Sequence, residues 1–245
     1  MLRFLATLLA GAALVLAGQS LFPALLPHSP AVVRNATASV GIKEKPSATP
    51  GNYVLSGPLS GSIQAETNKK YDDALKEVSA YQKSGGDPFV ASLRAGWLFY
   101  LKGAYPEAEQ SYANANRLHP TAMNALLGLL TVAEAMKDGK RIQRAAEAML
   151  KIEPSNYRAN MAIGGSCYAS RDYRGAAFAY RRILGFYPDD VDARSGLAWA
   201  DYFSGDKPDA LSQFQKILSI YPDYPHAREG YKLLTAGNGG VGSLR

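Results

Sequence analysis

The sequence contains one cysteine, Cys167, and three histidines among 245 residues. A single cysteine excludes an internal disulfide and any zinc site built on several cysteines. The histidines lie far apart in the sequence, and none has a histidine or cysteine partner at the spacing of metal ligands. We therefore expect neither a disulfide scaffold nor a metal centre.

A block of basic residues is also missing, although the formal net charge is +6. Acidic residues are interleaved with lysine and arginine over most of the chain. Proteins that bind nucleic acid usually concentrate their positive charge in a patch. The pattern favours a mildly basic surface, and we expect no nucleic-acid partner.

The residue groups that carry out catalysis are absent as well. Gly164 and Gly165 fall inside an expected helix, where they serve packing, so they do not form a phosphate-binding loop. Nucleophilic catalysis needs a serine or cysteine beside a histidine base, whereas Cys167 falls on the core side of a helix. The sequence predicts a protein that is not an enzyme and binds no cofactor. An accessory domain of an enzyme, or a hydrolase on the same scaffold, is a third alternative, after the two functions given below.

The first 26 residues are expected to direct the chain into or across a membrane. Arg3 precedes an uncharged run from Phe4 to Gly18, whose 15 residues fit the apolar region of a signal peptide cleaved after Ala17. If the run extends to Leu26, about 23 residues are long enough to span a bilayer. Both interpretations stay open. Both predict an exported protein, periplasmic or membrane-anchored and facing the periplasm or the outside.

Residues 27–63 are rich in proline, serine and glycine and show no sustained hydrophobic period. This composition predicts a linker, and it leaves room for a short strand at residues 53–63. The glycine-rich residues 236–245 are expected to form a flexible tail.

Four prolines, Pro120, Pro154, Pro188 and Pro222, lie 34 residues apart. Each follows an apolar segment with a helical period, and because proline cannot continue a helix, each marks a helix end. If this proline is numbered 32 in each unit, small residues recur at positions 8 and 20 in most units, and larger ones at positions 24 and 27. A repeated two-helix unit of this kind is expected to stack on its neighbours.

This pattern resembles the tetratricopeptide repeat, a 34-residue helix–turn–helix unit. Residues 103–120 (GAYPEAEQSYANANRLHP) and 171–188 (RDYRGAAFAYRRILGFYP) match it best, whereas Ile142 and Ala146 depart from it in the second unit. The resemblance implies an all-α fold, a right-handed α-solenoid over residues 64–235. Its expected parts are a partial repeat at 64–86, full repeats at about 87–120, 121–154, 155–188 and 189–222, and a capping helix at 224–235.

In this family the first helix of each repeat lines a concave groove, chiefly through positions 2, 5, 9, 12 and 13. Both tryptophans fall at position 9. Because tryptophan, tyrosine and arginine often anchor interfaces, the resemblance implies a partner-binding groove. The alternative is that the tryptophans only fill the wall between neighbouring helices. The predicted groove residues are Leu93, Trp97, Tyr100, Leu127, Thr131, Arg158, Met161, Tyr168, Trp199, Tyr202 and Phe203.

These features predict a non-catalytic scaffold or adaptor of the cell envelope, which binds a protein partner from an envelope assembly. The alternative is a structural, self-associating subunit, a homo-oligomer whose groove is filled by a second copy or by its own linker. The N-terminal segment adds contact with the membrane if it is not cleaved.

Overall fold

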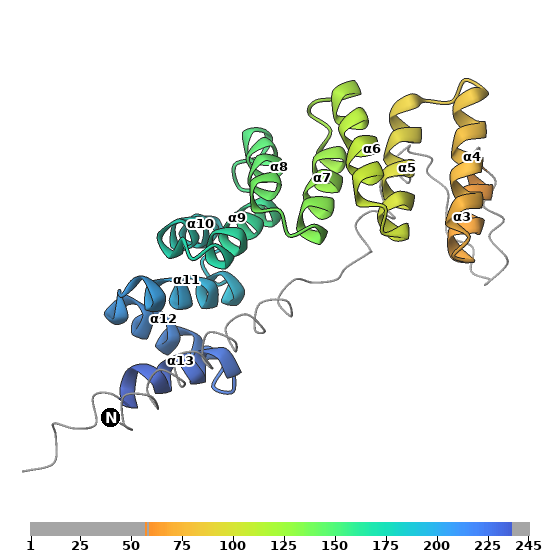
Figure 1. Ribbon diagram of the computed structural model, residues 1–245. Helices are drawn as coiled ribbons and strands as arrows, with labels where there is room; N and C mark the ends of the chain where they lie inside the picture. The colour runs from red at the N-terminus through yellow and green to blue at the C-terminus, as the bar shows by residue number, and fades with distance from the viewer. Residues whose placement is uncertain (1–56, 58, 237–245) are drawn as a thin grey trace, which may run out of the picture. The chain divides into compact units, whose positions relative to one another are not determined.

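The computed structural model of the protein describes residue 57 and residues 59–236, and every regular element in this part of the chain is an α-helix (Figure 1). The chain forms two compact units, which meet in sequence between Ile152 and Glu153 and are called here the N-terminal and C-terminal units. The predicted all-α repeat fold is confirmed. The predicted export segment, most of the predicted linker and the tail from residue 237 lie outside the described residues.

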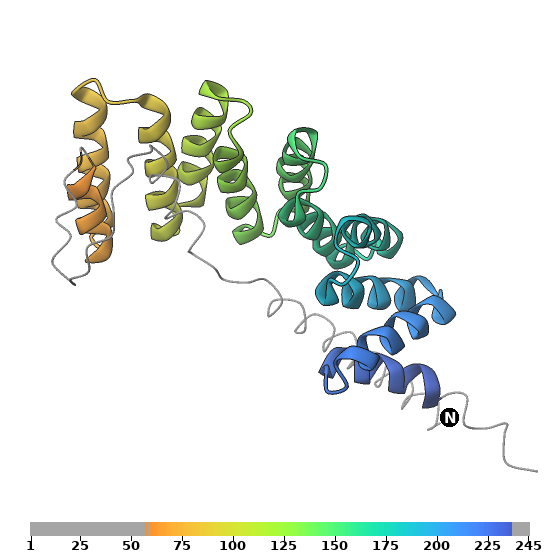
Figure 2. The same cartoon turned by 180° about the vertical axis from the view of Figure 1, so that it is seen from behind.

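Within each unit the helices form antiparallel hairpins that pack on one another in chain order (Figures 1 and 2). The N-terminal unit contains α3 (Ser60–Thr67), α4 (Tyr71–Lys83), α5 (Pro88–Lys102), α6 (Tyr105–Leu118), α7 (Met123–Ala135) and α8 (Gly139–Ile152). The C-terminal unit contains α9 (Tyr157–Ala169), α10 (Tyr173–Phe186), α11 (Val191–Ser204), α12 (Lys207–Ile220) and α13 (Pro225–Ala236).

The second helices of the repeats end two residues before the repeated prolines. For example, α10 ends at Phe186, before Pro188. Aspartates mark several helix starts: the Asp172 carboxylate accepts a hydrogen bond from the Gly175 N–H in α10, and Asp190 caps α11 in the same way. Such caps satisfy backbone N–H groups that have no partner within the helix.

One residue in each hairpin turn has a left-handed backbone conformation, and these residues lie 34 apart. Gly103 and Gly205 adopt φ values of 79° and 95°, and Lys69, Lys137 and Arg171 adopt values of 58°, 54° and 63°. This conformation is strained for residues that carry a Cβ atom, so three of the five turns are less favourable than the glycine turns. Lys69 lies 34 residues before Gly103, so the turn between α3 and α4 has its left-handed residue at the same repeat position as the other hairpin turns.

Helix α3 corrects the predicted extent of the linker, because residues 60–63 are helical and residues 59–63 contain no strand. Its sequence, SGSIQAET, has little helical preference, and helices this short are marginal in isolation. Contacts with the rest of the unit stabilise it: Ser62 is fully buried, and Leu59 packs against the apolar cluster that contains Ala74 and Val78.

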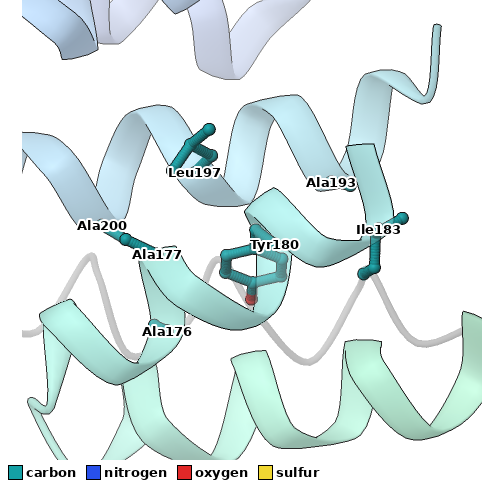
Figure 3. Close-up of a cluster of buried hydrophobic side chains, with 7 residues drawn as sticks. All are labelled: Ala176, Ala177, Tyr180, Ile183, Ala193, Leu197 and Ala200. Atoms are coloured by element: carbon teal, nitrogen blue, oxygen red, sulfur yellow. The ribbon is translucent and has the colours of Figure 1, made fainter. Parts of the chain in front are cut away.

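An aromatic ring at position 24 fills the space between neighbouring first helices. Tyr180 on α10 packs against Leu197 on α11 (Figure 3). A Cβ atom added to Gly164 on α9 or to Gly196 on α11 would lie 2.7 or 2.6 Å from the Tyr180 ring. The close fit therefore depends on glycine on both sides. Tyr112, Gly96 and Gly128 repeat this arrangement in the N-terminal unit.

Candidate partner-binding surface

The predicted groove residues lie on the first helices of the repeats, α5 and α7 in the N-terminal unit and α9 and α11 in the C-terminal unit. Phe203 is the exposed member, at 38%, whereas Trp199 is only 9% exposed and the others are half-buried. Each unit carries its own aromatic group on these helices.

In the N-terminal unit, Trp97 is held by a residue of α3. Its indole Nε1 donates a hydrogen bond to Glu66 Oε1 at 2.9 Å. The same carboxylate forms a 2.5 Å ion pair with Arg94, and Arg94 Nε donates to Ser62 Oγ at 3.0 Å. The side chains of Glu66 and Arg94 are only 19% and 15% exposed. Trp97 is thus engaged within the chain, a contact that the sequence did not reveal because α3 was not predicted as a helix.

Tyr100 extends this group along α5. Its ring stacks on Trp97 with centroids 5.7 Å apart, and it lies 5.9 Å from the ring of Tyr105 at the start of α6. Leu93 packs with these residues against the buried ring of Tyr112. The predicted residues of α5 therefore form part of the packing between α5 and α6.

Four predicted residues lie outside the aromatic groups. On α7, Thr131 Oγ1 donates to the backbone oxygen of Leu127 at 2.8 Å, so this hydroxyl is used within its own helix. On α9, Met161 packs against the core cluster that contains Tyr180. Arg158 is half-buried near the N-terminal end of α9.

In the C-terminal unit, four aromatic side chains meet around a fifth, Phe203. The centroid of its ring lies 5.2 Å from that of Tyr173, 5.1 Å from that of Tyr202, and 5.9 Å from those of Tyr168 and Trp199. These distances are typical of stacked and edge-on aromatic pairs. We call this group the C-terminal aromatic cluster. The exposure of Phe203 leaves apolar surface at its centre open to solvent.

Trp199 lies on the core side of this cluster. Its ring is 5.3 Å from that of Phe214, and it packs with the buried residues Ala198 and Ala210. Of the two interpretations of the position-9 tryptophans, packing between helices describes Trp199. The more open members of the cluster are Tyr168, Tyr173, Tyr202 and Phe203.

Tyr173 is the cluster member that the sequence prediction omitted. It begins α10, five residues after Tyr168, and the two rings lie 5.4 Å apart across the hairpin turn. The same spacing joins Tyr100 to Tyr105 in the N-terminal unit. Two tyrosines five residues apart, one on each side of a predicted turn, are therefore the sequence signal that could have placed Tyr173 in the cluster.

Comparison with known proteins agrees with this architecture. Profiles described as tetratricopeptide repeat match residues 64–123, 135–191 and 168–234, together more than half of the chain. The chain belongs to the tetratricopeptide repeat family. A search of curated proteins gives no match.

Several solved tetratricopeptide structures resemble this one. A tetratricopeptide repeat protein from Parabacteroides merdae is 19% identical, with a TM-score of 0.61 over 73% of this chain and 71% of its own. MamA from Desulfovibrio magneticus, from residue 41 to its end, is 17% identical, with a TM-score of 0.56 over 67% and 93%. YrrB, described as a TPR protein with an unusual peptide-binding site, is 17% identical, with a TM-score of 0.58 over 70% and 88%. Identities this low show a common fold alone.

One tetratricopeptide helix of this chain carries a buried carboxylate. Asp201 on α11 is 2% exposed; its Oδ1 accepts a 2.7 Å hydrogen bond from Arg181, and its Oδ2 is buried without a partner. Burial raises the pKa of Asp201 to about 6, although the attraction of Arg181 lowers it. Repulsion from Asp206 and Asp209 raises it further by smaller amounts. The charge state of Asp201 therefore links the packing of α10 and α11 to pH.

Cys167 on α9 does not have the surroundings of a nucleophile. It is half-buried and packs against the cluster that contains Tyr180. Burial, and to a smaller extent Asp172, raises the pKa of its thiol, whereas reactive cysteines have a lowered pKa. Among residues 57 and 59–236 there is no group of three or more side chains suited to binding a metal. No helix of that same part of the chain is long and apolar enough to span a bilayer.

Proposed function

We propose that the protein is a non-catalytic scaffold that binds a segment of a partner protein at the C-terminal aromatic cluster. The observation that carries this proposal is Phe203, which is 38% exposed at the centre of four further aromatic rings. Aromatic side chains on rigid helices are frequent anchors of interfaces, because they bury a large area and lose little conformational freedom. A helical or extended segment that places an apolar side chain on Phe203 would cover this surface.

The C-terminal cluster is a better candidate than the group around Trp97. The indole N–H of Trp97 already binds Glu66, and an incoming partner would have to compete with the ion pair between Glu66 and Arg94. The peptide-binding site described for YrrB, which shares the fold, also supports a peptide segment as the ligand.

We place this scaffold in the cell envelope, with a protein of an envelope assembly as its partner. The support is the uncharged run from Phe4 to Gly18 behind Arg3. Fractionation of cells that express the full chain tests the location. Recovery with the periplasm or the membranes is expected, and recovery only with the cytoplasm would contradict it.

The binding proposal is tested by two matched substitutions of exposed phenylalanines. A partner is first captured by crosslinking from the envelope fraction, and its affinity is then measured by calorimetry. Phe203→Ala is expected to weaken binding by at least about ten-fold, since loss of an anchor costs more than about 1.4 kcal/mol. Phe178→Ala, on α10 and 65% exposed, is the control and should bind as the wild type does. Equal effects of the two substitutions would reject the cluster as the binding site.

One observation favours self-association as the second candidate function. The residue at position 30 is apolar and exposed in each full repeat, and exposed apolar surface is typical of protein contacts. The position-30 residues are Leu118, Ile152, Phe186 and Ile220, at 41%, 41%, 52% and 62% exposure. Light scattering tests self-association: a concentration-dependent dimer that Ile220→Lys abolishes would support it.

A further inference from the structure

A groove in the N-terminal unit lies between α4 and α6, with α5 as its floor. Its volume is about 690 Å³. Its lining combines apolar side chains, among them Leu75 and Phe99, with the polar side chains of Ser79, Gln82 and Gln110. This surface is distinct from the aromatic group around Trp97. We refer to it as the α4–α6 groove.

We propose that the segment Tyr53-Val54-Leu55 of the same chain docks in the α4–α6 groove. The linker would then be fixed to the N-terminal unit shortly before α3 begins. This inference goes beyond the proposed function, because it concerns another surface and another unit, and either proposal can fail without the other.

The polar groups of the groove suit an uncharged, extended segment. The side chains of Gln82 and Gln110 form no hydrogen bond with the described residues, and amide groups can both donate to and accept from a peptide backbone. A backbone that leaves water needs such partners. The charged lining residues, Glu107 and Arg117, have opposite signs, so the groove has no net preference for a charged ligand.

The sequence before α3 has the matching chemistry. No charged residue occurs from Pro46 to Ala65. Within that stretch, Tyr53-Val54-Leu55 is the one run of three consecutive large apolar residues. These three side chains would otherwise be left in water by a linker rich in serine, glycine and proline.

The distance along the chain also fits. Helix α3 packs on one side of α4, where Gly61 lies against Glu77, whereas Leu75, Ser79 and Gln82 face the groove on the other side. Crossing one helix means spanning about 10 Å. The four residues from 55 to 58 reach about 13 Å when extended. So short a tether gives an effective concentration of about a millimolar, which makes weak groove contacts sufficient for docking.

Disulfide trapping in the full chain tests this proposal. In a Cys167→Ser background, Leu55→Cys is combined with Gln110→Cys at the groove or with Lys76→Cys on α4 outside it. Lys76 is next to Glu77 and therefore closer to the start of α3, so an undocked segment would react with it preferentially. We expect intramolecular crosslinking to Gln110→Cys to be at least about five-fold faster.

Two further results complete the test. Adding Tyr53→Ser should remove the preference for Gln110→Cys, because the apolar contact is lost while the tether is unchanged. Equal or faster reaction with Lys76→Cys, or no crosslink with either partner, would overturn the proposal. Crosslinked dimers whose yield rises with protein concentration would also overturn it and would assign the groove to a second copy of the chain.

Discussion

Tyr180 and Gly196 are matched in shape, since a Cβ atom on Gly196 would lie 2.6 Å from the Tyr180 ring. The rings of Tyr112 and Phe214 meet Gly128 and Gly230 in the same way, always from position 24 of one repeat to position 6 of the next. Where position 24 is Ala146, position 6 of the following repeat is Ala162 rather than glycine. The packing of repeats is therefore specified by pairs of residues.

Gly196→Ala is expected to destabilise the C-terminal unit by about 2 kcal/mol, because the buried Tyr180 ring has no room to move away. Gly165→Ala, on α9, is the matched control: nothing lies within 4 Å of its added methyl group, so a gain of about 0.5–1 kcal/mol in helix propensity should remain. Urea unfolding followed by circular dichroism measures both. Tyr180→Leu should lower the cost of Gly196→Ala, and additive effects would contradict the steric explanation.

Arg171→Gly is expected to stabilise the C-terminal unit by about 0.5–1 kcal/mol, since glycine adopts the left-handed turn conformation without Cβ strain. Gly205→Ala, at the equivalent turn, should destabilise it by about 1 kcal/mol. Thermal unfolding of both variants provides the measurement. If both substitutions moved the melting temperature in the same direction, backbone strain at this turn position would not be the cause.

Asp201 is expected to make the C-terminal unit more stable as the pH falls. Its folded-state pKa is about 6, above the unfolded value of 3.8, so the folded state binds a proton more readily. Above pH 6 the buried, charged carboxylate lowers the free energy of unfolding. As the pH falls through 6 towards 4 the carboxylate is protonated, and the free energy of unfolding rises by at most about 3 kcal/mol. Asp201→Asn should therefore raise the free energy of unfolding at pH 7.5 and leave it nearly unchanged at pH 4.

Asp138 provides a control of opposite sign for this pH dependence. The hydrogen bond from the Arg141 backbone N–H lowers the pKa of Asp138, so its contribution is present at neutral pH and is lost as the pH falls through its lowered pKa. Asp138→Asn should thus reduce stability at pH 7.5. The difference between wild type and each variant is measured by urea unfolding from pH 7.5 down to about pH 2. The two differences should have opposite slopes: that of Asp201 changes as the pH falls through about 6, and that of Asp138 changes only below its ordinary pKa of 3.8.

Glu66→Ala is expected to destabilise the N-terminal unit by about 1–3 kcal/mol, because it leaves Arg94 and the Trp97 indole without their buried partner. Fluorescence in a Trp199→Phe background reports on this unit alone, since Trp97 is then the single tryptophan. Lys76→Ala, which breaks an exposed ion pair with Asp73, is the control and should leave stability almost unchanged, because water screens exposed ion pairs. Similar effects of the two substitutions would show that α3 is not held by Glu66.

The proposed binding site was predicted only in part. Trp199 and Phe203 lie at positions 9 and 13 of the same repeat, and both were predicted to line the groove. Trp199 is buried against Phe214, however, whereas Phe203 is exposed. Repeat numbering assigns a residue to a helix face, but the depth of a side chain depends on which rings surround it. Tyr173 joins the site for that reason, through a turn that brings it against Tyr168.

The sequence by itself determined the 34-residue period, the helix ends before the prolines and the pairing of small with large residues. These features are set by local backbone geometry and by volume at fixed spacings, which a single chain displays directly. The tertiary structure alone decided that SGSIQAET forms α3, that Glu66 binds Trp97, and that the chain divides into two units after Ile152. Each of these depends on contacts between residues about 30 positions apart or on the summed packing of many helices, and such contacts outweigh weak local preferences.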